Sequence, residues 1–240
     1  MNGGRLDGRL LAGVFALVAI LALLASTPLR LVMGERAAAA GLSAERVSGT
    51  VWAGTLTGAR FQGLALGEVD VGLNPLALLI GRVRLGFDST VARGALRLAP
   101  QGIAFEDVNL TAPTGVIAPG LPLSGTAELS DLDLDLIGGA CRKAWGQVRL
   151  SDLALDGVPL PGLVLSGAPV CAEEAVRLPL SGQAQGIDVQ AEFVARTSGA
   201  YQLTTTLRTT RPELDPLLTA AGYVRGLDGY SRTQAGRLGR

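Results

Sequence analysis

The sequence of 240 residues contains no histidine, and this absence excludes more functions than any residue present suggests. Without an imidazole there is no Ser-His-Asp or Cys-His nucleophile, no histidine general base, and none of the common zinc sites. The two cysteines, Cys141 and Cys171, are too few for a structural metal site or an iron–sulfur cluster. We therefore expect a protein that is not an enzyme and that holds neither a metal nor another cofactor.

The sequence also lacks a concentration of charge. The formal net charge is zero, with 21 basic and 21 acidic residues, and the acidic residues are spread through the chain. A nucleic-acid-binding protein carries a basic face, and a cation site needs an acidic patch, and neither stands out here. The sequence predicts no nucleic-acid partner.

One long stretch, residues 10–29, has no charged side chain. Twenty residues at a rise of ~1.5 Å cross roughly the 30 Å of a bilayer's hydrocarbon core. The sequence therefore predicts a single transmembrane helix from Leu10 to Leu29, with residues 1–9 as a cytoplasmic tail. The alternative is a cleaved signal peptide, although its apolar part would exceed the usual ~7–15 residues.

The pattern changes after this stretch. Residues 30–46 are prone to form a helix and are predicted to be a juxtamembrane connector, whereas residues 47–240 alternate apolar and polar positions between glycines. Such alternation is typical of strands with one buried and one solvated face. The sequence predicts a mainly β protein, in which the transmembrane helix precedes an elongated, curved antiparallel β-sheet, an open groove or half-barrel, with one or two short helices.

Two segments predict the short helices. In residues 74–81, Asn74 suits the N-cap, Pro75 the first helical position and Gly81 the position after the helix. The middle of this segment is entirely apolar, so we expect the sheet to cover it. Residues 213–222 predict a second short helix.

Residues 131–136 alternate aspartate and leucine, and alternating carboxylates suggest a calcium site. On a strand, however, Asp131, Asp133 and Asp135 lie on one solvated face at a spacing of ~6.6 Å, without a glycine turn to wrap them around an ion. We interpret the run as the polar face of a strand.

The two cysteines are 30 positions apart, and in an exported domain they are expected to form a disulfide. Cys141 follows a turn-like Gly-Gly-Ala sequence, and Cys171 follows Ala-Pro-Val near the end of another strand. Hairpins between them allow the chain to turn back and bring the two residues together. The alternative is two separately buried thiols.

Over most of its length the chain resembles the protein N family of the type II secretion system. The resemblance rests on the short tail and single anchor, the Val-Ser-Gly-Thr-Val-Trp-Ala-Gly sequence of residues 47–54, the apolar insert of residues 76–81, Cys141 and Cys171, and the Leu, Gly and Tyr positions of residues 214–238. It implies a single-pass inner-membrane protein of a diderm (Gram-negative) bacterium. The bulk of the chain would lie in the periplasm, within machinery that moves folded proteins through the outer membrane.

A second, more distant resemblance is to the AsmA-like envelope proteins, which form a curved β-groove for lipid. It rests on the Asn74-Pro75-Leu76 sequence between strands and on the glycine-led hairpins. Two hypotheses follow. The first is a non-enzymatic component of the type II secretion system whose partners are other secretion subunits. The second is a periplasmic lipid-binding or lipid-transfer groove whose partner is membrane lipid.

Overall fold

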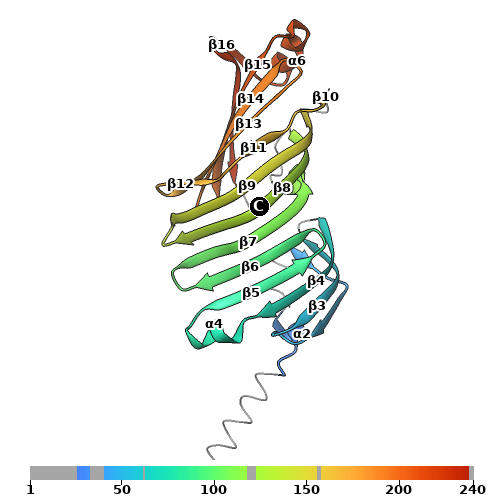
Figure 1. The fold of residues 1–240 in the computed structure, drawn as a ribbon, viewed down its shortest axis with the longest axis vertical. Coiled ribbons are helices and arrows are strands. Elements are labelled where there is room, and N and C mark those ends of the chain that lie inside the picture. Colours follow the sequence, from blue (N-terminus) through green and yellow to red (C-terminus); the bar gives the residue numbers. More distant parts are fainter. Residues whose placement is uncertain (1–25, 33–40, 62, 118–122, 156–157, 238–240) are drawn as a thin grey trace, which may run out of the picture.

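The computed structural model describes residues 26–32, 41–61, 63–117, 123–155 and 158–237. In these residues the chain forms one open antiparallel sheet of 17 strands, drawn out along one long axis (Figure 1). The prediction of a mainly β protein with short helices is confirmed. The predicted transmembrane helix, including its first residue Leu10, lies almost entirely outside the described residues. No helix within the described ranges is long and apolar enough to cross a bilayer.

Strands that follow one another in the chain lie next to one another in the sheet. The main order is β2, β3, β4, β5, β6, β7, β8, β9, β11, β13, β14, β15, β17 and β16, with β1 beside β3, β10 beside β9 and β12 beside β13. The strands are β1 (Leu42–Ser43), β2 (Arg46–Gly49), β3 (Gly54–Phe61), β4 (Leu64–Leu73), β5 (Val83–Ser89), β6 (Ala92–Ala99), β7 (Gly102–Pro113), β8 (Leu123–Ile137), β9 (Ala140–Leu155), β10 (Val158–Pro159), β11 (Leu165–Gly167), β12 (Val170–Ala172), β13 (Ala175–Ala184), β14 (Ile187–Arg196), β15 (Ala200–Thr209), β16 (Val224–Gly226) and β17 (Gly229–Arg237).

The helices are short and lie between strands or at the ends of the sheet. They are α2 (Leu29–Val32), α4 (Pro75–Leu79), α5 (Thr114–Ile117), the 3-10 turn η1 (Pro212–Leu214) and α6 (Asp215–Ala220). The capping prediction for α4 is confirmed, because Asn74 Oδ1 accepts hydrogen bonds from the backbone N–H of Leu76 at 2.9 Å and of Ala77 at 3.3 Å. Gly81 follows the helix with φ +70°.

The expectation that the sheet covers α4 is wrong. Leu76 and Ile80 are both strongly exposed, and Leu78 is exposed to a smaller extent. The N-cap at Asn74 and the bond from the Arg82 backbone N–H to the Ala77 carbonyl hold this turn without help from burial.

Three β-bulges bend the long central strands. In each, an aspartate with φ of 50–52° and the apolar residue after it lie opposite a single glycine of the neighbouring strand. A bulge increases the local right-handed twist, which agrees with β5–β9 running across the long axis of the molecule and β13–β15 running along it (Figure 1). The three sets are Asp107 and Val108 opposite Gly94, Asp131 and Leu132 opposite Gly146, and Asp152 and Leu153 opposite Gly125.

Among the described residues, buried apolar side chains gather in two separate clusters. The N-terminal core contains Leu29, Val51, Leu56, Ala59 and Val69. The C-terminal core lies around β13–β15 and α6; its buried members are Val148, Leu153, Leu163, Leu165, Leu180, Ile187, Val189, Ala191, Leu207, Leu218, Tyr223 and Tyr230.

The fold includes described residues that precede the expected β-domain of residues 47–240. Leu29, the expected last residue of the membrane anchor, is only 5% exposed and packs in the N-terminal core. Just before it, the Val51 backbone N–H donates to the Thr27 carbonyl at 3.1 Å, so the fold already includes Thr27. β1 lies within the expected connector of residues 30–46, and β2 begins at its last residue, Arg46. Both pair with β3, because the edge of β3 supplies hydrogen-bonding partners that outweigh helix propensity.

Candidate functional site

The middle of the sheet presents an apolar surface made from the alternate residues of four strands. The register aligns Leu85, Leu96, Phe105 and Leu134 in one row across β5–β8. A second row lies beside it and contains Val83, Leu98, Ile103 and Leu136. Together the two rows form what we call the central apolar face, consisting of Val83, Leu85, Leu96, Leu98, Ile103, Phe105, Leu134 and Leu136.

None of the eight side chains of the central apolar face is fully buried among the described residues, and Ile103 is 44% exposed. Neither core cluster includes any of them. The face has no charged group, so its surface can bind an apolar partner by removing aliphatic area from water.

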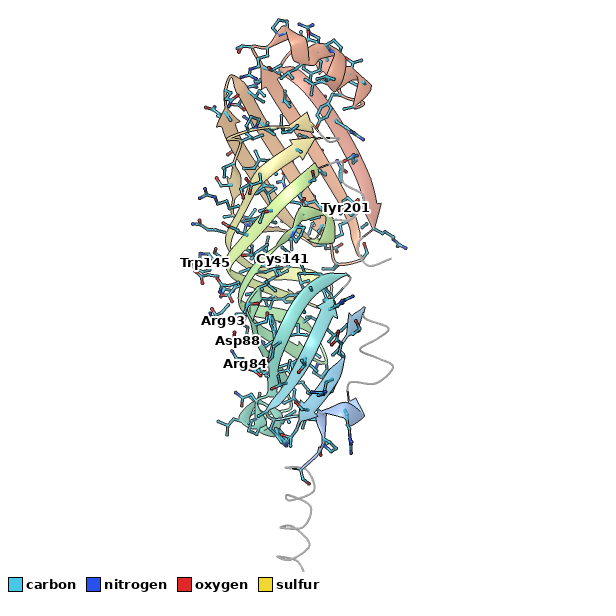
Figure 2. All side chains as sticks on the ribbon, turned by 90° about the vertical axis from the view of Figure 1, so that its right-hand side faces the viewer. Arg84, Asp88, Arg93, Cys141, Trp145 and Tyr201 are labelled. Atoms are coloured by element: carbon cyan, nitrogen blue, oxygen red, sulfur yellow. A yellow bond between two sulfur atoms is a disulfide. The ribbon has the colours of Figure 1, made fainter. Side chains whose placement is uncertain are left out.

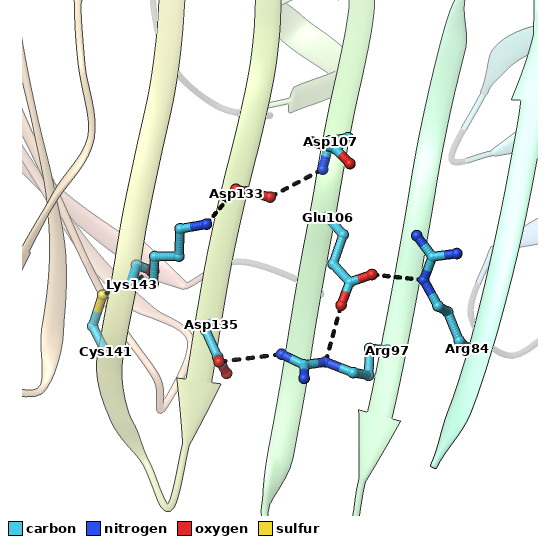
Figure 3. Close-up of polar contacts among 8 residues, drawn as sticks. All are labelled: Arg84, Arg97, Glu106, Asp107, Asp133, Asp135, Cys141 and Lys143. Carbon is cyan, nitrogen blue, oxygen red and sulfur yellow. Dashed lines mark hydrogen bonds and ion pairs between the residues drawn. The ribbon is translucent and has the colours of Figure 1, made fainter. Parts of the chain in front are cut away.

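The opposite side of the same strands, which we call the outer polar face, carries a lattice of ion pairs (Figure 3). Arg84 Nε lies 2.7 Å from Glu106 Oε2, and Arg97 Nε lies 3.1 Å from Glu106 Oε1. Arg97 also reaches Asp135, with 3.3 Å between Nη2 and Oδ2. These pairs cross from β5 to β8. They tie together strands whose central apolar face, in the part of the chain that the structure describes, belongs to neither buried cluster.

A second part of the lattice joins β7, β8 and β9. Asp133 accepts hydrogen bonds from Lys143 Nζ and, at 3.1 Å, from the backbone N–H of Asp107 in the first bulge. The Lys143 ammonium and then the Asp107 N–H lower the pKa of the Asp133 carboxyl. Asp133 in turn raises the pKa of Lys143. A carboxylate with a lowered pKa is ionised at neutral pH, so Asp133 is not suited to act as a general acid.

The predicted row of three aspartates is only partly present. Asp133 and Asp135 lie on the outer polar face, where each has a cationic partner, but Asp131 forms a bulge with φ +50°. The alternating sequence could not show this bulge, because the extra residue changes the register without changing the pattern. Within the described ranges, no group of three His, Cys, Asp or Glu residues is placed to hold a metal ion.

The outer polar face also carries an exposed tryptophan, Trp145, which lies opposite Asp133 in the register of β8 and β9. It is 60% exposed, and Figure 2 shows it projecting from the same side of the molecule as Arg84, Asp88 and Arg93. The sequence pattern did not predict an exposed tryptophan here. The available signal was that the alternate positions on either side of it in the strand, Lys143 and Gln147, are polar.

The two cysteines lie where the central strands meet the C-terminal part of the sheet. The structure joins Cys141 of β9 to Cys171 of β12, with 5.4 Å between their Cα atoms. Nearby, Thr197 Oγ1 donates to the Gly139 carbonyl at 2.8 Å, linking the β8–β9 and β14–β15 turns. The disulfide and this bond connect the two differently oriented parts of the sheet.

These features define a class of protein, an extended β-sheet scaffold with one open apolar face and one ion-paired face. Residues 40–234 match the family model described as Type II secretion system (T2SS), protein N. The match spans nearly the whole sheet, so the chain belongs to the type II secretion system protein N family. The chain has no significant match among curated proteins or solved structures.

Proposed function

We propose that the protein is a non-enzymatic assembly component of the type II secretion system, anchored in the inner membrane with its sheet in the periplasm. The observation that carries this proposal is the family match across residues 40–234, which include nearly the whole sheet. The absence of histidine from the sequence is consistent with a scaffold role, because it removes the commonest catalytic base.

A disulfide between Cys141 and Cys171 supports the periplasmic location. Disulfides persist in oxidising compartments such as the periplasm and are rare in the cytosol. A reporter that is active only after export tests the topology. It should be active when fused after Arg240 and silent when fused before Leu10. The reverse result would place the sheet in the cytoplasm and overturn this part of the proposal.

Trp145 offers a specific contact for another secretion subunit. Tryptophan is enriched among the residues that dominate binding energy at interfaces, and this one stands exposed beside the ion-paired lattice. Cross-linking in intact envelopes should recover a secretion subunit from the wild type and much less of it from Trp145→Ala. Leu227→Ala, at a fully exposed turn elsewhere, is the matched control. Normal secretion in a deletion strain, with no subunit captured, would reject the assembly role.

A second candidate function, lipid binding, is favoured by the central apolar face. Four adjacent strands spaced ~4.8 Å apart extend about 14 Å, close to the half-thickness of about 15 Å that one leaflet's acyl chains occupy. A photo-reactive residue at Ile103 should trap a lipid acyl chain, whereas one at Arg93 on the opposite face should not. Equal trapping at both positions, or none at Ile103, would count against a lipid groove.

A further inference from the structure

The α4 turn exposes apolar side chains in an unusual concentration. Leu76 is 72% exposed, Ile80 68% and Leu78 37%. The turn is nevertheless tied to the sheet, since the Asn74 backbone N–H donates to the Arg84 carbonyl at 2.9 Å and the Arg82 N–H donates to the Ala77 carbonyl at 2.9 Å. A fixed, capped turn with uncovered leucine and isoleucine is a surface built to contact an apolar environment.

The position of α4 in the molecule identifies that environment. Figures 1 and 2 both place α4 at the same end of the long axis as α2, where the described chain begins. Leu29 is buried in the domain and the Thr27 carbonyl accepts a bond from Val51, so no spacer separates the uncharged stretch from this end. If residues 10–26 cross the bilayer, the membrane surface lies directly against the end that carries α4.

Charge at this end fits a lipid surface as well. Residues 74–81 contain no charged side chain, but exposed Arg82 follows them directly, and Arg30 in α2 is also exposed. Apolar side chains flanked by arginine are typical of segments that lie in the interface between headgroups and acyl chains. The guanidinium groups are attracted to anionic phospholipid headgroups.

We propose that α4 inserts into the outer surface of the membrane that anchors the protein. Leu76, Leu78 and Ile80 then lie among the acyl chains, and Arg82 lies at the lipid phosphates. This inference rests on the proposed membrane anchor. Together, the anchor and α4 give the domain two points of contact with the bilayer. The sheet then stands with its long axis away from the membrane, and the β16–β17 turn lies at its distal end (Figure 1).

The distal end provides a matched control, because Val224 in β16 is 69% exposed, almost the same as Ile80. The experiment uses the full-length protein in liposomes of neutral and anionic phospholipid, with a photo-reactive amino acid at position 80 or 224. We expect lipid adducts to form several-fold more at position 80 than at position 224.

The inference would be overturned if the two positions labelled lipid equally. It would also be overturned if position 80 formed adducts with protein and none with lipid. Flotation of the same liposomes separates this failure from failure of the proposed anchor. Protein that floats with the liposomes but is not labelled at position 80 retains the anchor and excludes the α4 contact. Protein that does not float excludes both.

Discussion

The C-terminal part of the sheet and its central part use the same alternation of apolar and polar residues but bury them differently. In the C-terminal part, Leu218 of α6 and Tyr223 close over the face that carries Val189 and Leu207, and all four are buried. In the central part, the described residues leave the equivalent apolar face of β5–β8 partly open to solvent.

The difference arises from the connections between strands. After β15 the chain forms η1 and α6, and the segment between β9 and β11 carries Leu163. Both of these connecting segments pack over the apolar face of the C-terminal part. Two-residue turns join β5 to β6 and β6 to β7, and such turns have no length to fold back. Alternation thus decides which side chains share a face, whereas the connecting segments decide whether that face is buried.

The largest expected effect on stability comes from removing the disulfide that joins the two parts of the sheet. Replacing both Cys141 and Cys171 with alanine should lower the free energy of unfolding by about 3–4 kcal/mol, the chain-entropy value for a loop of about 30 residues. Urea unfolding under oxidising conditions measures the change. Alkylation of denatured, unreduced wild-type protein should label no thiol. Two labelled thiols, or an unchanged urea midpoint, would show that the bridge does not join the parts in solution.

Truncation of one leucine of the C-terminal core and one of the central apolar face tests the comparison directly. Leu153, 2% exposed in the C-terminal core, should cost about 3 kcal/mol when replaced by alanine, because the change removes buried methyl groups and leaves a cavity. Leu98→Ala on the central apolar face should cost less than about 1 kcal/mol, because Leu98 is exposed. Equal costs in urea unfolding would mean that something covers the central face.

The bulges in the central strands should be sensitive to a single methyl group. A Cβ on Gly146 would lie 2.8 Å from the Asp131 carbonyl oxygen, and Gly146 has φ +125°. We therefore expect Gly146→Ala to lower stability by about 2 kcal/mol through strain and displacement of the bulge. Gly115→Ala, which meets no neighbouring atom, is the control and should leave the thermal midpoint unchanged or raised. Similar losses for both would argue against a rigid bulge.

The smallest effect concerns the ion pairs of the outer polar face. Because Asp133 has a pKa lowered from its ordinary 3.8, its interactions stabilise the folded state above that value and are lost as the pH falls below it. Wild-type stability should therefore decline more steeply than that of Asp133→Asn below about pH 4. Parallel curves for wild type and Asp133→Asn would show that the pair contributes nothing.

The sequence predicted the faces of the strands and the caps of α4 because both depend on neighbouring residues. Alternation assigns faces, and Asn74 and Gly81 carry the capping chemistry in their own side chain and backbone. It did not predict the exposure of α4 or the pairing of Arg97 with Glu106 and Asp135. The exposure of α4 depends on whether another segment packs over it, which neighbouring residues do not encode. The pairing of Arg97 depends on register between strands that bulges shift, and a bulge such as that at Asp131 leaves alternation intact.

Strands follow nearly the same order in the chain and in the sheet, and this affects how the sheet can fold and how its number of hairpins can change. Each new strand pairs with an edge made by residues shortly before it, so the sheet can grow from one end while later residues are still unplaced. By the same logic, loss or duplication of one hairpin would shorten or lengthen the sheet without requiring any other strand to change partners. The architecture therefore allows the distance between its two ends to be adjusted in hairpin-sized steps.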